Sequence, residues 1–446
     1  MVPAGARKPS PVADGSLEEV ISEKQFTGIL GERAQVFYRL TNSLLLRADQ
    51  DWMRAHFYAL ISETDTLEAF LDDYGARYNR TFSFFRELVA STRGIALAGF
   101  SVTHLERRFA SYGTILTPRE SESALASIRE SRAFLLGALR TLLGATIQEG
   151  ADRGIAVPRD GLADEEKVRE TPRQKLPRNT DQEDLEDDEQ KIAEVAAKFL
   201  QVCEMFDDLG VRRIVDEDER EKYLRSVCSE EQARVYEATV HNLQSAYDTW
   251  VKNTVIESSD PRLPRLRGHA SAALHLLESV THLVHFVERH ESGLRNEMIE
   301  RRLAALVPRA QVRDYTLNHV LYWAAQLVRR GRPIAEDLLP SYTNVQLLEV
   351  TLGDDVSLHA RPAALIVGIV NRYGTPVEME IEGRKCNAAS ILDLMVAVGS
   401  HPHARKFRFR GDEKPLRDIE ILFRSGLGEK GIDRLPSDLS YLRSGL

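Results

Sequence analysis

The stretch SLHARPAA at positions 357–364 decides the fold of the C-terminal part of this chain. Pro362 has no amide hydrogen and suits the first turn of a helix, and it pushes Arg361, the residue before it, out of the helical region. A helix therefore begins here, with His359 just outside its N-terminus. The unpaired amides and the positive dipole end favour an anion, and the Arg361 guanidinium adds a second phosphate donor.

A histidine at such an anion site indicates phosphoryl transfer. A neutral imidazole nitrogen is a good nucleophile near physiological pH. Its attack on phosphorus gives a phosphohistidine, and the helix amides stabilise the dianion where it forms. A carrier must release the group to the next acceptor, so partly exposed amides suit it better than a deep cationic pocket. We therefore expect a phosphohistidine carrier rather than a turnover enzyme.

The residues around this helix start alternate between apolar and charged, as half-buried strands do. Segment 345–352 is strand-like, and apolar residues alternate with glutamates in 377–382 and with basic residues in 406–410. Such alternation is typical of an antiparallel sheet with one face on a core. Short helical patterns lie at 363–370, 391–398 and 416–423. With a short strand just before Ser390, the predicted order is β-α-β-β-α-β-α.

Three motifs stand in register with these elements. They are LHARPA at 358–363, NAASILDLM at 387–395 and SGLGE at 425–429. With them, the C-terminal part resembles HPr, the histidine-containing phosphocarrier of the bacterial phosphoenolpyruvate-dependent phosphotransferase system. The resemblance covers positions 345–429 of a chain of 446 residues, so most of the chain lies outside it.

The resemblance implies an open-faced β-sandwich, in which a four-stranded antiparallel sheet carries three helices on one face. It also implies that His359 accepts and donates the phosphoryl group, that Arg361 stabilises it, and that Ser390 is a regulatory serine. The implied docking surface for Enzyme I and acceptor proteins consists of Ile391, Leu392 and Met395. The implied partners are an Enzyme I-like phosphoryl donor, an acceptor protein of the phosphotransferase system and an HPr kinase.

Two positions depart from the family pattern. Ser357 stands where the family usually has glycine before the Leu-His pair, and Asp393 stands where glycine is common. Asp393 puts a negative charge beside the implied docking surface, whereas neither change removes a reacting group. The departures therefore bear on which partners are recognised.

The rest of the chain is predicted to be helical, which makes the whole α+β. Capping signals such as TPRE at 117–120 precede apolar residues at helical intervals, and the last helix is expected to end near Gly331 and Pro333. The stretch 181–189, which has seven acidic residues in nine, indicates a flexible linker. The expected units are a disordered tail at 1–15, helical blocks at 16–150 and 191–340, an acidic linker at 151–190, the HPr-like domain at 345–429 and a tail at 430–446.

A second candidate site is a stripe of polar side chains in the second helical block. His275, Glu278, His282 and His285 follow at intervals of 3, 4 and 3 and share one helix face. This spacing can bind a transition metal, but the same helix carries a separate apolar stripe. We favour a solvated or partner-facing polar surface and expect no metal there.

The composition excludes several function classes. The net charge is −9, from 59 Lys and Arg against 68 Asp and Glu, which is unlike a nucleic-acid binder. The basic residues of 405–410 alternate with phenylalanines and indicate a solvent-facing strand surface. No run is apolar enough to span a membrane, no nucleotide-binding motif is found, and the three cysteines match no metal or disulfide spacing. We expect a cytoplasmic protein without a cofactor or membrane insertion.

Two functions fit these observations. The first is a phosphocarrier or a phosphorylation-controlled regulator, which accepts a phosphoryl group on His359 and passes it on or signals its state through the helical region. The alternative is a non-catalytic scaffold or interaction protein that uses a degenerate HPr-like module for docking. The exposure of His359 distinguishes them, since a buried imidazole would favour the scaffold.

Overall fold

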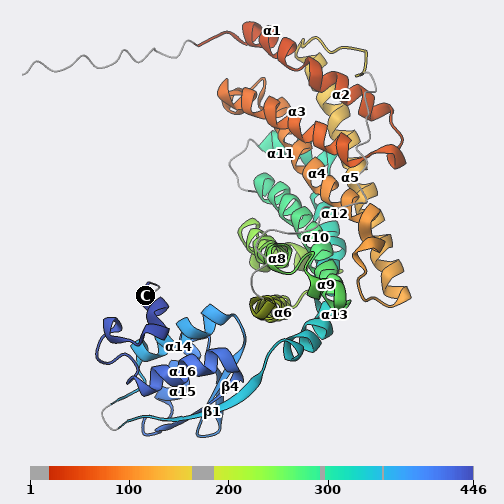
Figure 1. Ribbon diagram of the computed structural model, residues 1–446. Helices are drawn as coiled ribbons and strands as arrows, with labels where there is room; N and C mark the ends of the chain where they lie inside the picture. Colours follow the sequence, from red (N-terminus) through yellow and green to blue (C-terminus); the bar gives the residue numbers. More distant parts are fainter. Residues whose placement is uncertain (1–19, 163–184, 292–296, 354–355, 445–446) are drawn as a thin grey trace, which may run out of the picture.

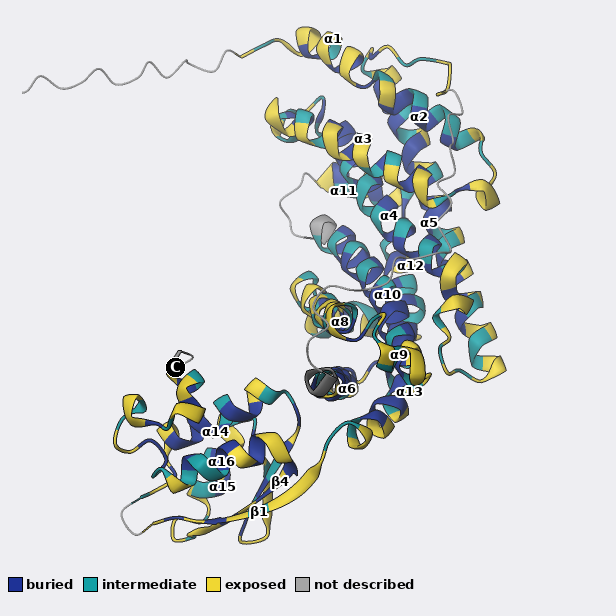
Figure 2. Cartoon of the chain, viewed as in Figure 1, coloured by how far each residue is buried: buried dark blue, intermediate teal, exposed yellow. Residues whose placement is uncertain are grey.

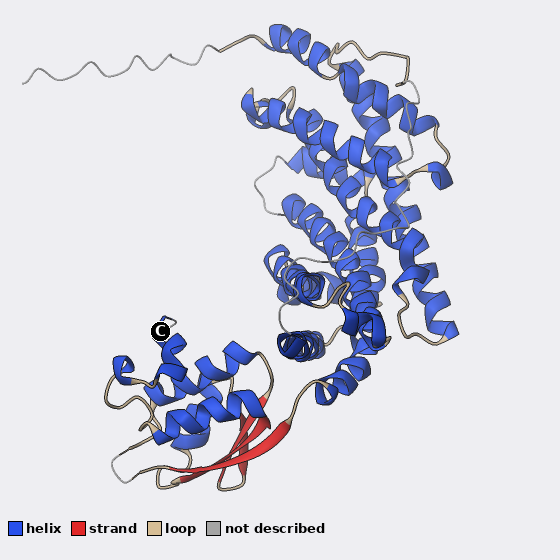
Figure 3. Cartoon of the chain, in the orientation of Figure 1, coloured by secondary structure: helices blue, strands red, loops and turns tan. Residues whose placement is uncertain are grey.

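The computed structural model describes residues 20–162, 185–291, 297–353 and 356–444. Helices make up most of these residues, and the strands lie together near the C-terminus (Figure 3). The tail expected at 1–15 and positions 163–184 of the expected linker lie outside the described residues. The α+β fold class predicted from the sequence is confirmed.

The N-terminal part consists of helices joined by short connections. The predicted capping box at 117–120 is present, because the Thr117 side chain accepts from the Glu120 amide and the Glu120 side chain accepts in return. The helices are α1 (Glu23–Arg33), α2 (Gln35–Leu46), α3 (Arg54–Asp73), α4 (Ser83–Arg108), α5 (Pro118–Asp152), α6 (Leu185–Asp208), α7 (Glu217–Val227), α8 (Glu230–Trp250), α9 (Val255–Ser259), α10 (Arg262–Glu291), α11 (Glu297–Leu306), α12 (Arg309–Asp314) and α13 (Tyr322–Leu338). A π-helical segment, Tyr315–Leu321, precedes α13.

One continuous hydrophobic core runs through these helices. Helix α4 packs against α3 and α5, and α10 packs against α4, α8 and α13. The helices form an elongated stack with α1 and α2 at one end and α13 at the other (Figure 1), and α10 is largely buried within it (Figure 2). The expected blocks 16–150 and 191–340 thus meet along α4 and α10. Among the described residues, no helix is both long and apolar enough to cross a bilayer.

The last helix of the stack extends beyond the predicted end near Gly331 and Pro333. Helix α13 continues through Pro333 to Leu338. A proline inside a helix costs about 3 kcal/mol because it removes a backbone hydrogen bond and crowds the preceding turn. Beyond it, Ile334 and Leu338 are buried in the core. We attribute the continuation to this apolar packing, which the local proline signal does not include.

The C-terminal domain, residues 345–444, has the predicted order of strands and helices. Its elements are β1 (Val345–Thr351), α14 (Ala360–Tyr373), β2 (Val377–Ile381), β3 (Arg384–Asn387), α15 (Ile391–Gly399), β4 (Lys406–Asp412) and α16 (Glu413–Arg424). The strands form a four-stranded sheet in the order β1-β4-β2-β3, and every neighbouring pair is antiparallel. Helices α14, α15 and α16 lie on one side of this sheet (Figures 1 and 3). The open-faced sandwich is therefore present.

The two faces of the sheet follow the predicted alternation. On the covered face, Met379 of β2 lies opposite Phe409 of β4, and both are fully buried. On the other face, Arg408 lies between Glu349 of β1 and Glu380 of β2, with N–O distances of 2.9 and 3.4 Å. The basic strand at 405–410 thus contributes to a solvent-facing row of ion pairs.

The segment 430–446, for which a tail was expected, contributes to the core of this domain as far as it is described. Two 3₁₀ segments, Ile432–Arg434 and Ser437–Ser444, follow α16. They bury Leu435, Leu439 and Leu442 in a second hydrophobic core, which is separate from that of the helical stack. The apolar side chains recur at intervals of four and three, so they share one face and pack against α14 and α16.

The helical stack and the C-terminal domain meet at a second place besides the chain connection into β1. The Gln190 side chain of α6 donates a 2.9 Å hydrogen bond to the backbone oxygen of Tyr373, at the end of α14. Glu194, one turn further along α6, lies against Gly374, where an added Cβ would come within 2.5 Å of its Cγ. Ala193 and Ala197 are buried on the same helix. We call this contact the α6–α14 junction.

Candidate functional site

His359 occupies the N-cap position of α14, as the sequence predicted for a residue just outside the helix. Its backbone is extended, with φ −118° and ψ −167°. Its Nδ1 accepts a long hydrogen bond, 3.4 Å, from the Arg361 amide. The side chain is 46% exposed, so the ring is open to a partner rather than covered by the helical stack.

The other ring nitrogen of His359 contacts a carboxylate. Nε2 lies 2.6 Å from Oε1 of Glu429. A carboxylate can only accept, so Nε2 carries the proton, while Nδ1 accepts from an amide and carries none. Together the two contacts select one neutral tautomer, in which the free lone pair lies on Nδ1, beside the helix N-terminus.

Glu429 reaches the histidine because of the turn that follows α16. Gly426, Leu427 and Gly428 all have positive φ, at 80°, 55° and 72°. Leu427 is buried in the second core, and an added Cβ at Gly428 would lie 2.8 Å from Leu365 of α14. The turn is therefore packed directly against the helix that carries the imidazole, and glycine is required at 428. The motif SGLGE is visible in the sequence, but this contact of Glu429 could not be predicted from it.

Arg361 lies one residue inside the helix and is exposed. Within the described residues, its guanidinium makes no ion pair and no side-chain hydrogen bond. An unpaired guanidinium beside a helix N-terminus suits a phosphoryl group, because it offers paired N–H donors to two oxygens. The structure thus places the imidazole and Arg361 at the same helix N-terminus.

Ser390 caps α15, where its Oγ accepts a 3.2 Å hydrogen bond from the Asp393 amide. The predicted docking residues lie on this helix. Ile391 and Leu392 are 44% and 68% exposed, whereas Met395 is half-buried and packs partly against the second core. Val396, which sequence analysis did not single out, is 46% exposed and extends the same apolar surface. Helix α15 packs against α14, whose N-terminus carries His359.

The histidine stripe of α10 does not converge on one site. His275 Nδ1 lies 3.1 Å from Glu278, and its ring packs edge-on against His104 of α4. His285 instead pairs with Glu230 of α8, at 2.8 Å. Within the described part of the chain, no group of three or more His, Cys, Asp or Glu residues could hold a metal ion. The expected solvated face is in fact half-buried, because α10 is surrounded by α4, α8 and α13.

His282 of this stripe and His104 of the neighbouring helix α4 have a lowered pKa. Burial lowers the pKa of His282 to about 4, and the nearby His285 lowers it further. Burial likewise lowers the pKa of His104 to about 4. Desolvation disfavours a charged imidazole, so these side chains do not carry a charge near neutral pH.

Comparison with known proteins identifies the family of the C-terminal domain. A family model for the PTS HPr component phosphorylation site matches residues 348–410. The HPr-like protein Crh of Halalkalibacterium halodurans is 39% identical over 67 residues, which are 15% of this chain and 80% of the relative. No solved structure matches the chain, and these matches leave the helical stack uncovered. Through its C-terminal domain, the chain belongs to the HPr family.

Proposed function

We propose that the protein is a phosphocarrier or a phosphorylation-controlled regulator of a bacterial phosphotransferase system. His359 accepts the phosphoryl group from an Enzyme I-like donor and passes it to an acceptor protein. The observation that carries this proposal is the state of the imidazole, half-exposed at a helix N-terminus with Nε2 tied to Glu429. The HPr family to which the domain belongs supports it.

The geometry supports a role for each atom in the proposed transfer. The Nδ1 lone pair attacks phosphorus, a nitrogen–phosphorus bond forms, and the bond between phosphorus and the donor's leaving atom breaks. The ring then carries positive charge, which the Glu429 carboxylate stabilises through the Nε2 proton. The Arg361 amide, released from Nδ1, can donate to a phosphoryl oxygen instead.

The same arrangement allows the group to leave again. The phosphoryl group sits at a surface where water competes for its oxygens, and the Arg361 guanidinium is a single flexible cation. Stabilisation at such a site stays modest compared with a buried one. The phosphorylated histidine is therefore not strongly stabilised, so the group can be transferred in either direction.

The start of α15 fits a second, regulatory modification. A phosphate on Ser390 would sit at a helix N-terminus, which favours it, next to Asp393, which repels it. It would also place about two negative charges beside Ile391 and Leu392, and so weaken apolar docking. We propose Ser390 as the target of an HPr kinase, Ile391, Leu392 and Met395 as docking residues, and the cytoplasm as the location of this exchange.

The decisive experiment is phosphorylation of the full chain with Enzyme I and labelled phosphoenolpyruvate. We expect acid-labile label on the wild type and none on His359→Ala. His403→Ala removes another exposed histidine of the same domain and is the matched control, which should label normally. Glu429→Ala should label roughly tenfold more slowly, because the tautomer is no longer selected.

The scaffold alternative gives the opposite pattern. It expects no label on the wild type with competent Enzyme I, and unchanged partner binding by His359→Ala. The exposure of His359 favours transfer, since no part of the described helical stack covers the ring. A labelled wild type with an unlabelled His359→Ala variant would exclude the purely non-catalytic function.

A further inference from the structure

The helical stack contains a cavity of about 290 Å³ between α4, α8, α10 and the segment after α3. Its lining is rich in cationic and imidazole side chains, which come from both sides of the cavity. They are Arg77, Arg86, Arg93, Arg234, His282 and His285. Glu68 is the one carboxylate among the described lining residues.

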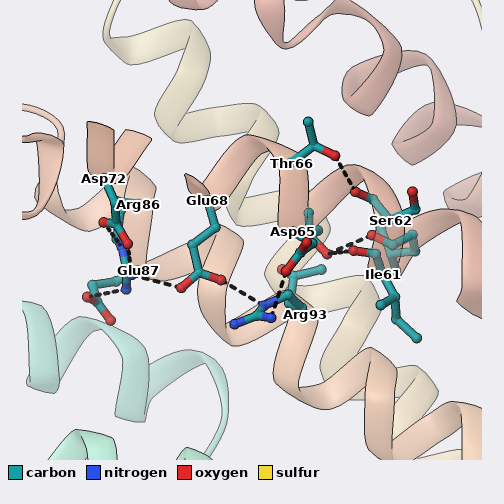
Figure 4. A network of polar contacts seen from close by, with 12 residues as sticks. Ile61, Ser62, Asp65, Thr66, Glu68, Asp72, Arg86, Glu87 and Arg93 are labelled. Carbon is teal, nitrogen blue, oxygen red and sulfur yellow. Dashed lines mark hydrogen bonds and ion pairs between the residues drawn. The ribbon is translucent and has the colours of Figure 1, made fainter. Parts of the chain in front are cut away.

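The wall formed by α3 and α4 holds its guanidinium groups rigidly. Arg86 is only 8% exposed, and it bonds Asp72 at 2.5 Å, Glu68 at 2.8 Å and Glu87 at 3.2 Å. Figure 4 shows its guanidinium enclosed by these three carboxylates. Buried charges need such partners, and here the partners accept from four of the five N–H groups of Arg86 and fix the direction of the fifth.

Arg93, two turns further along α4, is held in the same way. It contacts Asp65 and the second oxygen of Glu68, both at 2.8 Å (Figure 4). Each carboxylate oxygen of Glu68 thus contacts one of the two arginines. The charge of this lining carboxylate is therefore already paired. Asp65, which neutralises part of the charge, does not line the cavity. This wall therefore presents two fixed guanidinium groups.

The opposite wall comes from α8 and α10. Glu230 bonds both Arg234 and His285, each at 2.8 Å, and so ties these two side chains together. His282 makes no hydrogen bond within the described residues, although it lines the cavity. An imidazole left without a partner at such a place has a nitrogen available for a ligand.

Two further lining residues, Arg77 and Gly94, leave room for a ligand. Arg77, from the 3₁₀ segment Ala76–Tyr78, is half-buried and makes no ion pair within the described residues. At Gly94, in the middle of α4, an added Cβ would find nothing within 4 Å. Among the described residues that line the cavity, one guanidinium has no ion pair and one imidazole has no hydrogen bond, and there is open space beside α4.

We propose that this cavity binds a small phosphate monoester. The Arg77 guanidinium and the His282 imidazole line the same cavity with the N–H groups of Arg93 that its carboxylate partners do not use. A tetrahedral group with three terminal oxygens can accept from several of them at once. The volume is at the lower end for ligand sites and fits a metabolite of a few carbons. Arg77 and His282 supply contacts that are unused in the free protein. The site lies outside the family match and is independent of transfer at His359.

The test is calorimetric titration of the full chain with glycerol 3-phosphate, inorganic phosphate and glycerol. We expect both phosphates to bind and glycerol not to bind, with the monoester the tighter of the two. Arg77→Ala should weaken binding at least tenfold, and it breaks no ion pair or hydrogen bond within the described residues. Arg129→Ala, an exposed arginine on α5 with only a 3.4 Å pair, is the matched control and should bind as the wild type does.

A second variant separates the site from general charge effects. His282→Gln keeps the net charge at neutral pH, because the imidazole is neutral there, and should also weaken binding. Unfolding temperatures of all variants without ligand establish that each is folded. Absence of phosphate binding by the wild type, or equal binding by Arg77→Ala, His282→Gln and Arg129→Ala, would overturn the proposal.

Discussion

The helical stack and the C-terminal domain use histidine in opposite ways. His269 of α10 is fully buried, with Nδ1 on the Leu327 oxygen at 2.7 Å and Nε2 accepting from the Ile115 amide at 2.8 Å. His359 is half-exposed, and its Nδ1 has only a 3.4 Å contact. A ring with two short bonds to backbone groups is part of the structure. A ring in which only one nitrogen makes a short contact has its other nitrogen available to react with a partner.

The same contrast extends to the two cores. The hydrophobic clusters of the stack and of the C-terminal domain are separate, although the two parts touch at the α6–α14 junction. Separate cores favour separate unfolding transitions, so a single two-state description is not expected for this chain. Three changes, given from the largest expected effect to the smallest, test how far the separation goes.

The largest effect is expected for Gly268→Ala on α10. An added Cβ would lie 1.8 Å from the backbone oxygen of Tyr112, so the helix and the loop must move apart. We expect the transition of the stack to lose about 3 kcal/mol, and the transition of the C-terminal domain to stay unchanged. Chemical denaturation, followed by signals from each part, measures both.

Gly137→Ala is the matched control for this change. Gly137 is exposed on α5, with nothing within 4 Å of an added Cβ. Alanine should stabilise the helix by about 0.5–1 kcal/mol. If Gly268→Ala also shifts the transition of the C-terminal domain, the two cores are coupled and the contrast fails.

The second effect is a pH dependence of the stack that originates at His269. Burial lowers the pKa of its imidazole to about 4, although the hydrogen bond to Leu327 acts in the opposite direction. The folded pKa lies below the unfolded value of 6.5, so the unfolded chain binds the proton first. The stability is fully present above pH 6.5 and is lost as the pH falls towards 4. Between pH 7 and 5, His269 alone should account for a loss of about 2 kcal/mol, and His104 and His282, whose pKa values burial also lowers, add to the loss of the stack.

Denaturation at pH 7, 6 and 5 measures this loss, since most carboxylates stay ionised in that range. An NMR titration of the His269 ring provides the direct check and should show a neutral ring at pH 5. A ring that titrates near pH 6.5 in the folded protein would contradict the structural role of this histidine.

The smallest effect concerns the α6–α14 junction. Gly374 has φ +65°, and an added Cβ would press on Glu194 of α6. Gly374→Ala should therefore open the junction and raise hydrogen exchange in the first turns of α6, besides about 1 kcal/mol of backbone strain. Gly383→Ala carries the same kind of strain, at φ +81° with nothing within 4 Å. It should leave exchange in α6 unchanged, and equal exchange in the two variants would mean that the junction does not hold the parts together.

The C-terminal domain could be predicted from the sequence because its signals are local. The alternation at 377–382 and the proline after Arg361 each specify an element without reference to the rest of the chain. The tautomer of His359 could not be predicted, because Glu429 reaches it through a turn that follows another helix. The cavity beside Arg86 could not be predicted either, because the helices that line it are far apart in the sequence. Helix α13 shows the same limit, since packing carries it past Pro333.

Helix α14 connects the end that carries His359 to the helical stack. It carries His359 at one end and Tyr373, held by Gln190, at the other. With 14 residues it is a rigid rod about 20 Å long. A tilt of about 10° at the end seized by a partner moves the opposite end by about 3–4 Å. A displacement of this size would break the hydrogen bond between Gln190 and the Tyr373 oxygen. A tilt of α14 at His359 would therefore change the contact with the helical stack.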